Sequence, residues 1–241
     1  MDSPHHFPTE DSFRMRGTHI SRIDVFSDVV LGFALVLLAV SLAIPKSFTD
    51  LRDPNPSFTT SVICLLMLVA VWYSHYVFFR RYGLHDQVTI ILNAALLFVT
   101  LFCVYPLKFL YSAMFAYLVR SDFSPRFAAA IQINGMLALY ALGFTAAFFL
   151  IAALYWNAWR LRELLALNGL ERLLTVSSIV DALGLAAIGL IACLASLVLP
   201  SSWVVYSAVL YLLVIPWKVL NGLYFGRKAR TLRKLVAAPT L

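Results

Sequence analysis

Four polar side chains stand inside stretches of the chain that are otherwise apolar: Asp28, His75, Asn93 and Asp181. An aspartate beside a histidine can transfer a proton, and carboxylate, imidazole and amide groups can also satisfy one another in a hydrogen-bonded network. If these stretches cross a membrane, a charged group costs about 2.5 to 3.5 kcal/mol to insert. Each side chain therefore needs a partner or a water-filled cavity, whichever chemistry it performs.

The other sequence features that catalysis requires are missing. The chain has no Walker A loop, glycine-rich dinucleotide turn, GxSxG elbow or HExxH pair. Cys64, Cys103 and Cys193 lie in apolar stretches without a CxxC pair, so neither a disulfide nor a metal site is expected. A membrane enzyme or assembly factor would need an intramembrane catalytic pair, for which the chain offers only Asp28 with His75. We expect no enzymatic activity and no cofactor.

The composition predicts an integral membrane protein. Of the 241 residues, 61% are hydrophobic and 13% are charged, and the mean hydropathy is +0.84. Crossing about 30 Å of hydrocarbon takes roughly 20 apolar residues in a helix. Six such windows predict an all-α fold with six transmembrane helices, because the alternating pattern of barrel strands is absent. The windows are residues 25–44, 58–79, 87–107, 128–158, 175–199 and 202–225.

The six-helix domain is expected to cover residues 21–226, between two cytoplasmic tails. Residues 1–20 are polar and contain no cleavable signal peptide, which predicts a mobile tail. Most of the 19 Lys and Arg residues fall within 14–22, 80–81, 160–172 and 227–234, so the positive-inside rule places both termini in the cytoplasm. The basic residues 227–241 then form a tail against anionic lipid, and the net charge of +7 requires no nucleic acid as a partner.

Helical periodicity separates the apolar and polar residues of the first window. At 100° per residue, Leu37 and Val40 fall within about 40° of Phe33, whereas Asp28 lies about 140° away, toward neighbouring helices. An apolar stripe of this kind is most often a packing surface for a subunit or for lipid. The polar residues lie at one membrane depth on three consecutive helices, and we expect them to form a network that fixes the first helix. They are Arg22, Ser27 and Asp28, then Trp72 and His75, then Asn93.

These residues carry a family resemblance. The run Arg22-x-x-x-Phe26-Ser27-Asp28 resembles the RxxxFSD signature of the lysosomal potassium channel and its bacterial and archaeal relatives. The sequence "WYSHYVFFRR", then "HD" followed by Asn93, and a third helix that ends at Pro106 are similar to the second and third helices of bacterial members. The resemblance covers about residues 22–106, and beyond them only the six-helix hydropathy agrees.

The resemblance implies a function and an assembly. Bacterial members of this family are homotetramers of six-helix subunits whose first helices surround a cation path without a TVGYG filter. Counted from the motif aspartate, the constriction falls on Phe33, Leu37 and Val40, a ring that closes by dewetting. The implied protein is a potassium-favouring channel for monovalent cations in the inner (plasma) membrane of a prokaryote. Arg22, Ser27 and Asp28 would then anchor the first helix from behind.

Other functions and roles stay open at this point. A secondary transporter would need discontinuous helices with paired Gly or Pro breaks, whereas Gly32, Gly143, Gly184 and Gly189 are scattered. An arginine and an acid at a helix start often serve as an interfacial anchor. His75 taken alone is more typical of a satisfied interior histidine than of a pH sensor.

Overall fold

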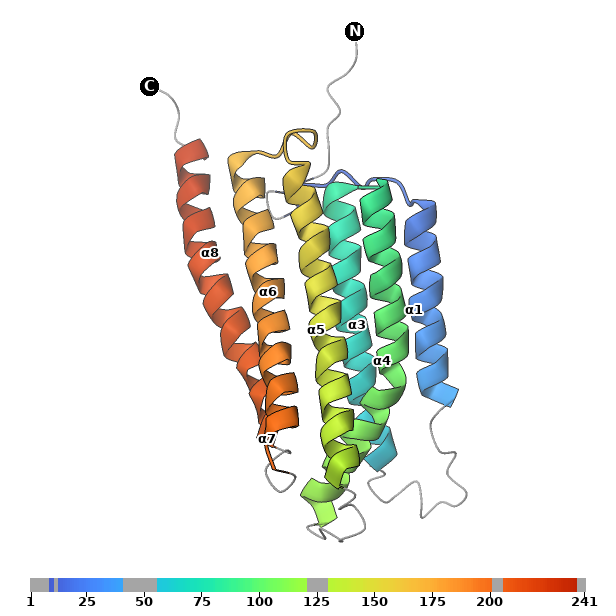
Figure 1. The fold of residues 1–241 in the computed structure, drawn as a ribbon. Helices are drawn as coiled ribbons and strands as arrows, with labels where there is room; N and C mark the ends of the chain where they lie inside the picture. The colour runs from blue at the N-terminus through green and yellow to red at the C-terminus, as the bar shows by residue number, and fades with distance from the viewer. Residues whose placement is uncertain (1–8, 11–12, 41–55, 121–129, 201–205, 238–241) are drawn as a thin grey trace.

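The computed structural model describes residues 9–10, 13–40, 56–120, 130–200 and 206–237. Within them, six long helices run up and down as an antiparallel bundle (Figure 1). They are α1 (Arg22–Val40), α3 (Pro56–Tyr82), α4 (Gln87–Arg120), α5 (Ala130–Arg160), α6 (Gly169–Val198) and α8 (Val214–Ala237). The short helix α7 (Tyr206–Val209) and the 3₁₀ turn η2 (Leu210–Leu213) precede α8. The strands β1 (Thr9–Glu10) and β2 (Phe13–Arg14) form a small antiparallel pair before the first helix, and the bundle itself is all-helical, as predicted.

The helices follow one another across the bundle. The first helix, α1, packs on α3 and α4, and the contacts continue from α4 to α5, from α5 to α6 and from α6 to α8. Helix α1 begins, and α8 ends, at the same end of the bundle, called here the upper end (Figure 1). Three helical stretches are long and apolar enough to cross a membrane in the part of the chain that the structure describes: Arg22–Val40, Asn134–Arg160 and Gly169–Val198.

The six predicted helices are present, and the limits of the third and the sixth differ most from the prediction. Helix α4 continues through Pro106 to Arg120, although the sequence predicted an end near that proline. A proline inside a helix leaves one backbone carbonyl without its hydrogen-bond donor. Within a membrane protein, neighbouring groups can bond to that carbonyl, so the helix can continue through the proline. The sixth window is interrupted by η2 just before Pro216. The ring of a proline collides with the carbonyl four residues earlier, so Pro216 is favoured in the first turn of a new helix.

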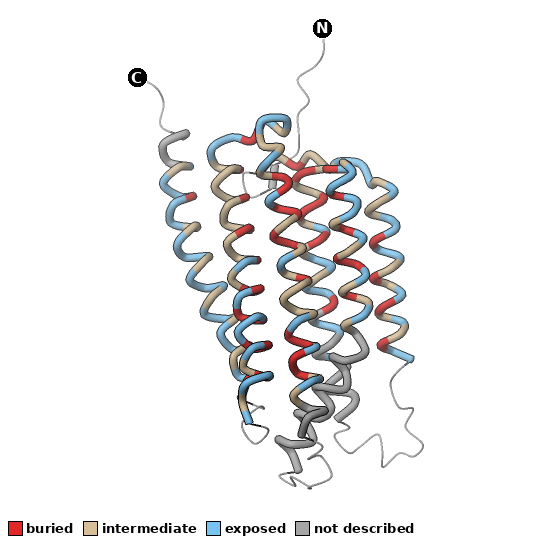
Figure 2. The backbone as a smooth tube through the Cα atoms, in the orientation of Figure 1, coloured by how far each residue is buried: buried red, intermediate tan, exposed pale blue. Residues whose placement is uncertain are grey.

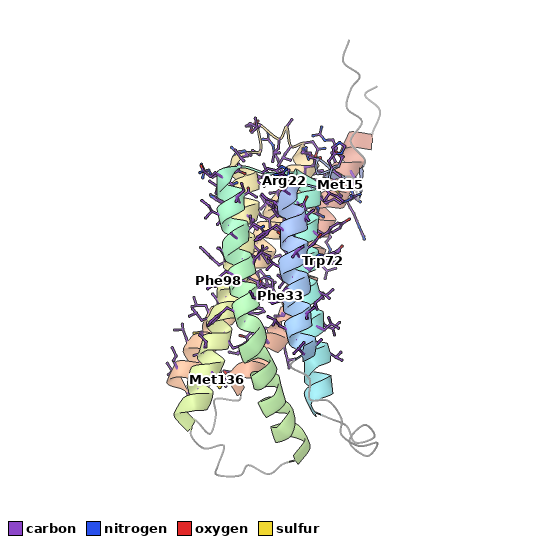
Figure 3. All side chains as sticks on the ribbon, turned by 90° about the vertical axis from the view of Figure 1, so that its right-hand side faces the viewer. Met15, Arg22, Phe33, Trp72, Phe98 and Met136 are labelled. Atoms are coloured by element: carbon purple, nitrogen blue, oxygen red, sulfur yellow. The ribbon has the colours of Figure 1, made fainter. Side chains whose placement is uncertain are left out.

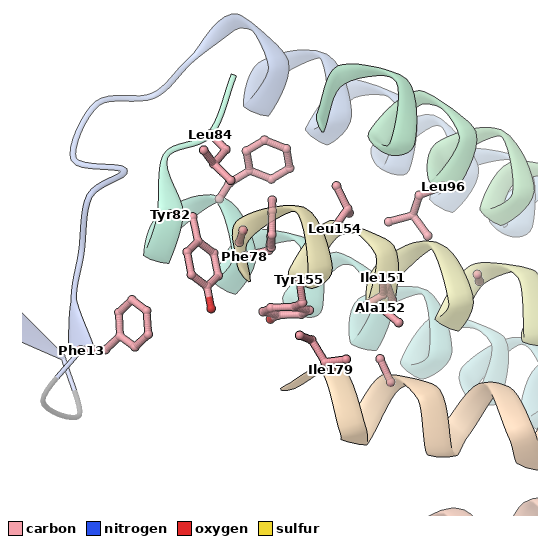
Figure 4. Packing of buried hydrophobic residues seen from close by; sticks show 14 of the residues in the cluster. Phe13, Phe78, Tyr82, Leu84, Leu96, Ile151, Ala152, Leu154, Tyr155 and Ile179 are labelled. Carbon is pink, nitrogen blue, oxygen red and sulfur yellow. The ribbon is translucent and has the colours of Figure 1, made fainter. Parts of the chain in front are cut away.

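The largest cluster of buried hydrophobic residues among the described residues lies at the upper end, where buried positions gather on α3 and α5 (Figure 2). Phe78 and Tyr82 of α3 meet Tyr155 of α5 edge to face, and Phe13 closes the cluster from the N-terminal side (Figure 4). Phe13 is completely buried. The sequence predicted a mobile tail up to residue 20, whereas residues 13–17 pack on the bundle because Phe13 and Met15 are apolar anchors in an otherwise polar segment.

Candidate functional site

Helix α1 has one face packed against the bundle and the opposite face uncovered. Ser27, Leu31, Ala34 and Leu38 are buried, and the three apolar residues among them join a cluster with Leu68 and Leu97 of α3 and α4. The helix begins with a reciprocal cap, in which Asp24 Oδ2 accepts from the Ser21 N–H at 2.9 Å and Ser21 Oγ accepts from the Asp24 N–H at 3.2 Å. This cap satisfies N–H groups that a helix start leaves unpaired. The packed face thus orients α1 within the bundle.

The uncovered face of α1 is a continuous apolar surface. It consists of Phe26, Val29, Phe33, Val36 and Val40, and Phe33 and Val40 are 56% and 77% exposed. Viewed from the α1 side, Phe33 lies on the outer helix of the bundle (Figure 3). Leu37 is half-buried, because it lies on the flank that turns toward the packed face. An uncovered apolar surface of this extent requires lipid or another protein surface as its neighbour.

Two of the predicted polar residues of α1 bind neighbouring helices. Ser27 Oγ, completely buried, accepts from Asn93 Nδ2 of α4 at 2.8 Å and donates to the Ile23 carbonyl within α1. Asp28 Oδ1, at the edge of the packed face, accepts from Trp72 Nε1 of α3 at 2.9 Å. Both contacts join α1 to the next two helices, which is the arrangement expected from the shared membrane depth.

His75 lies beside this network without completing it. Its ring is buried against Phe79, with ring centroids 4.5 Å apart. Neither His75 Nε2 nor Asn93 Oδ1 has a hydrogen bond among the described residues. Trp72 instead stacks on Tyr76, one turn along α3, at 5.7 Å. The structure therefore joins Ser27 to Asn93 and Asp28 to Trp72, with His75 beside Asn93.

Arg22 and Phe26 lie outside these contacts. Both side chains are exposed, and Arg22 has no ion pair within the described part of the chain. Arg22 precedes Phe33 by eleven residues, which is close to three helical turns, so both point to the same side of α1. Arg22 was expected to anchor the helix from behind, but in this structure it lies on the uncovered face.

A second polar cluster lies where α4 begins, and the sequence prediction missed it. Asp86 accepts hydrogen bonds from the Thr89 N–H, from Thr89 Oγ1 and from Asn157 Nδ2 of α5. Partial burial alone would raise the pKa of the Asp86 carboxyl, but the bonds from Thr89 and Asn157 outweigh it and hold this pKa below its usual value. The spacing Asp-x-x-Thr before an apolar run is a helix-start signal that could have revealed half of the cluster.

Asp181, which the sequence left without a partner, is paired with Lys218 of α8. Lys218 Nζ lies 2.7 Å from Asp181 Oδ2, and Trp217 Nε1 donates to the Asp181 carbonyl at 3.2 Å. The Trp217 ring lies directly against Gly184, where any Cβ would collide with it. One helical turn beyond Lys218, Asn221 Nδ2 donates to the Ser177 carbonyl at 3.3 Å. These contacts hold α8 on α6.

A bundle of six long, largely apolar helices joined by isolated polar pairs defines a polytopic helical membrane protein. Residues 22–106 match the sequence model of the family described as endosomal/lysosomal potassium channel TMEM175. A potassium channel of Marivirga tractuosa is 37% identical to this chain over 235 residues, which cover 92% of the chain and 94% of the relative. The chain belongs to the family of the endosomal/lysosomal potassium channel TMEM175, which confirms the resemblance.

Solved structures agree with this assignment. The chain is similar to the potassium channel MtTMEM175, crystallised as a variant with a nanobody–MBP fusion protein, at 34% identity and a TM-score of 0.76. The match covers 91% of this chain and 99% of that one. A TMEM175 homologue from Chamaesiphon minutus shares the fold at 19% identity and a TM-score of 0.56, over 83% of this chain and 96% of the other.

Proposed function

We propose that this protein is a potassium-favouring cation channel, a homotetramer in which four α1 helices surround the ion path. The named relatives are potassium channels, and the observation that carries the pore assignment is the uncovered apolar face of α1. Four such faces, each too apolar to be left in water, would cover one another around a central axis. No cofactor is required, and K⁺ is the expected permeant ion.

The side chains on this face would form a hydrophobic constriction. Phe33 and Val40 project from its centre, and Leu37, at the flank, would face the adjacent subunit as well as the axis. A narrow apolar ring excludes water and therefore ions, and conduction requires the ring to widen until an ion can pass hydrated. The pairs Ser27–Asn93 and Asp28–Trp72 would hold the back of α1 while its front face opens and closes.

The upper end of the bundle would face the cytoplasm of a prokaryotic cell. It carries the arginines in the last turns of α3 and α5 and the basic second half of α8, including Arg80, Arg81, Arg160, Arg227 and Arg230. Positive charge of this kind is retained on the cytoplasmic side of a plasma membrane and attracts anionic lipid headgroups. Both termini would then be cytoplasmic.

The test is cation flux through the purified protein in liposomes under a potassium gradient. Phe33→Ala is expected to raise the flux or relax the preference for K⁺ over Na⁺, because it removes the bulkiest group of the constriction. Phe149→Ala is the matched control, since Phe149 is a phenylalanine of α5 that is 59% exposed, close to the 56% of Phe33. Unchanged conductance and ion preference in Phe33→Ala would overturn the pore assignment.

The same assay distinguishes a secondary transporter, the second candidate. The break between α7 and α8 at η2 is the one feature of the described chain that favours a transporter, because transporters bind solutes at interrupted helices. A channel passes ions at high rates without a counter-substrate. Saturable flux at carrier turnover, with no effect of Phe33→Ala, would support the transporter.

A further inference from the structure

The segment that precedes α1 is fastened to the upper end of the bundle. We call residues 13–17 the strap. The Phe13 ring is completely buried and meets Tyr82 of α3 edge to face, with centroids 5.6 Å apart (Figure 4). The Arg81 guanidinium lies 5.2 Å from the centre of the same ring. The first contact of the strap is therefore apolar and is made with the end of α3.

The second contact is a buried carboxylate at the start of α6. The Glu171 side chain has no exposed surface, and it binds two arginines of the strap. Glu171 Oε1 accepts from the Arg14 N–H at 2.9 Å, and Oε2 accepts from Arg14 Nη2 at 3.0 Å and from Arg16 Nη2 at 2.8 Å. It also accepts from the Asn168 N–H, as part of the cap of α6. A buried carboxylate with this many donors holds its partners firmly, since removing one partner leaves a charge uncompensated.

Backbone hydrogen bonds complete the attachment. The Arg16 N–H donates to the Arg81 carbonyl at 3.3 Å, and the Gly17 N–H donates to the Arg80 carbonyl at 3.1 Å. These carbonyls belong to the last turn of α3, which has no partners for them within the helix. A Cβ at Gly17 would collide with the Phe79 carbonyl, so the close approach requires glycine.

The strap is joined to α1 by a very short link. Only Thr18, His19 and Ile20 separate Gly17 from Ser21, the residue that caps α1. Each residue spans at most about 3.6 Å, so the start of α1 cannot move far from the strap. Helix α1 itself packs on α3 and α4. The strap, which is covalently continuous with α1, adds a noncovalent attachment to α6 through Glu171.

We propose that Glu171 is a positioning residue for α1: by holding Arg14 and Arg16 it fixes the strap and thereby the upper end of the helix. The consequence for conduction rests on the proposed function, in which α1 must move to open its apolar ring. Releasing the strap changes how readily α1 moves without changing the side chains on its uncovered face. The flux should therefore change while the preference between K⁺ and Na⁺ does not.

The test combines hydrogen exchange with flux, on the full-length protein in lipid. In Glu171→Gln the amides of residues 18–26 are expected to exchange about tenfold faster than in the unsubstituted protein, because the opening of this segment costs less. The K⁺ flux is expected to change by about threefold or more, at constant ion preference. Glu171→Asp keeps the charge and is expected to restore most of the protection. Glu163→Gln is the matched control, since Glu163 is an exposed carboxylate on the loop that precedes α6 and pairs with Arg172 and not with the strap.

Three results decide the proposal. Faster exchange confined to the first turn of α6, with residues 18–26 and the flux unchanged, would overturn it and leave Glu171 as a helix cap only. If Glu171→Gln does not fold, the triple change Arg14→Gln, Arg16→Gln and Glu171→Gln removes all three charges without leaving one unpaired, and the same outcomes apply. If the unsubstituted protein passes no K⁺, the proposed function fails, while the exchange data still support or refute the tether.

Discussion

The hydrogen bond between Ser27 of α1 and Asn93 of α4 allows a quantitative test of how α1 is held. Both side chains are buried, and Asn93 Nδ2 lies 2.8 Å from Ser27 Oγ. Interhelical hydrogen bonds in membrane proteins contribute about 0.6 kcal/mol on average and up to about 1.7 kcal/mol. Since this bond is short and shielded, we expect about 1 to 1.7 kcal/mol of coupling between the two residues, the upper part of that range.

The assay is a double-mutant cycle with Ser27→Ala, Asn93→Ala and the double change, measured as reversible unfolding in mixed detergent micelles. The pair Asp28 and Trp72 is the comparison, because it lies at the edge of the packed face and is expected to couple by about 0.6 kcal/mol or less. A coupling between Ser27 and Asn93 no greater than that of the edge pair would refute the reasoning that the buried bond is the main attachment of α1. Each single change is also expected to alter the flux, since it loosens the back of the helix.

Two further predictions concern the ends and the packing of the other helices. Hydrogen bonds from Thr89 and Asn157 hold the pKa of the Asp86 carboxyl below its usual value. The ionised carboxyl therefore stabilises the fold fully above about pH 4, the usual range of an aspartate pKa. This stabilisation is lost as the pH falls through the lowered pKa. Asp86→Asn is expected to lower the free energy of unfolding by about 1 kcal/mol at pH 7 and by progressively less as the pH falls below about 4, measured by thermal unfolding; a cost that does not change with pH would contradict this. Gly184→Val places a side chain where the Trp217 ring lies, so α8 must shift. The free energy of unfolding is expected to fall by about 1 to 3 kcal/mol. A Gly222→Val control has open space, and because valine is no worse than glycine inside a helix it is expected to cause no loss; equal losses in the two variants would show that the Trp217 contact is unimportant.

The arrangement of helices could be predicted from the sequence because a membrane imposes one dominant requirement. Long apolar windows must be helical, so the six long helices follow from hydropathy alone. Periodicity then separates Phe33 and Val40 from the packed face of α1, and shared depth brings Ser27 to Asn93 and Asp28 to Trp72. These inferences use only helix geometry and the number of crossings.

The rest depends on contacts between residues that are far apart in the chain. Arg14 and Glu171 are separated by 157 positions, and nothing in the local sequence connects them. Phe13 and Met15 stand in a polar segment that has the composition of a solvated tail, and the packing of residues 13–17 depends on a surface that exists only after α3, α5 and α6 have assembled. The continuation of α4 through Pro106 likewise depends on its surroundings, because the local effect of proline favours a break. Leu37 lies about 40° around the helix from Phe33, on the side toward the packed face. A difference of this size is too small for an ideal helical projection of the sequence to separate the two residues.

The position of α1 in the assembled protein decides whether this chain forms a pore as proposed. The measurement is a structure of the protein in lipid nanodiscs by electron cryomicroscopy, with the symmetry axis and the lipid boundary resolved. We expect four subunits, with Phe33 and Val40 of each α1 directed at the axis and Ser27 directed away from it. An α1 at the periphery, with its apolar face against acyl chains, would contradict the proposed ion path.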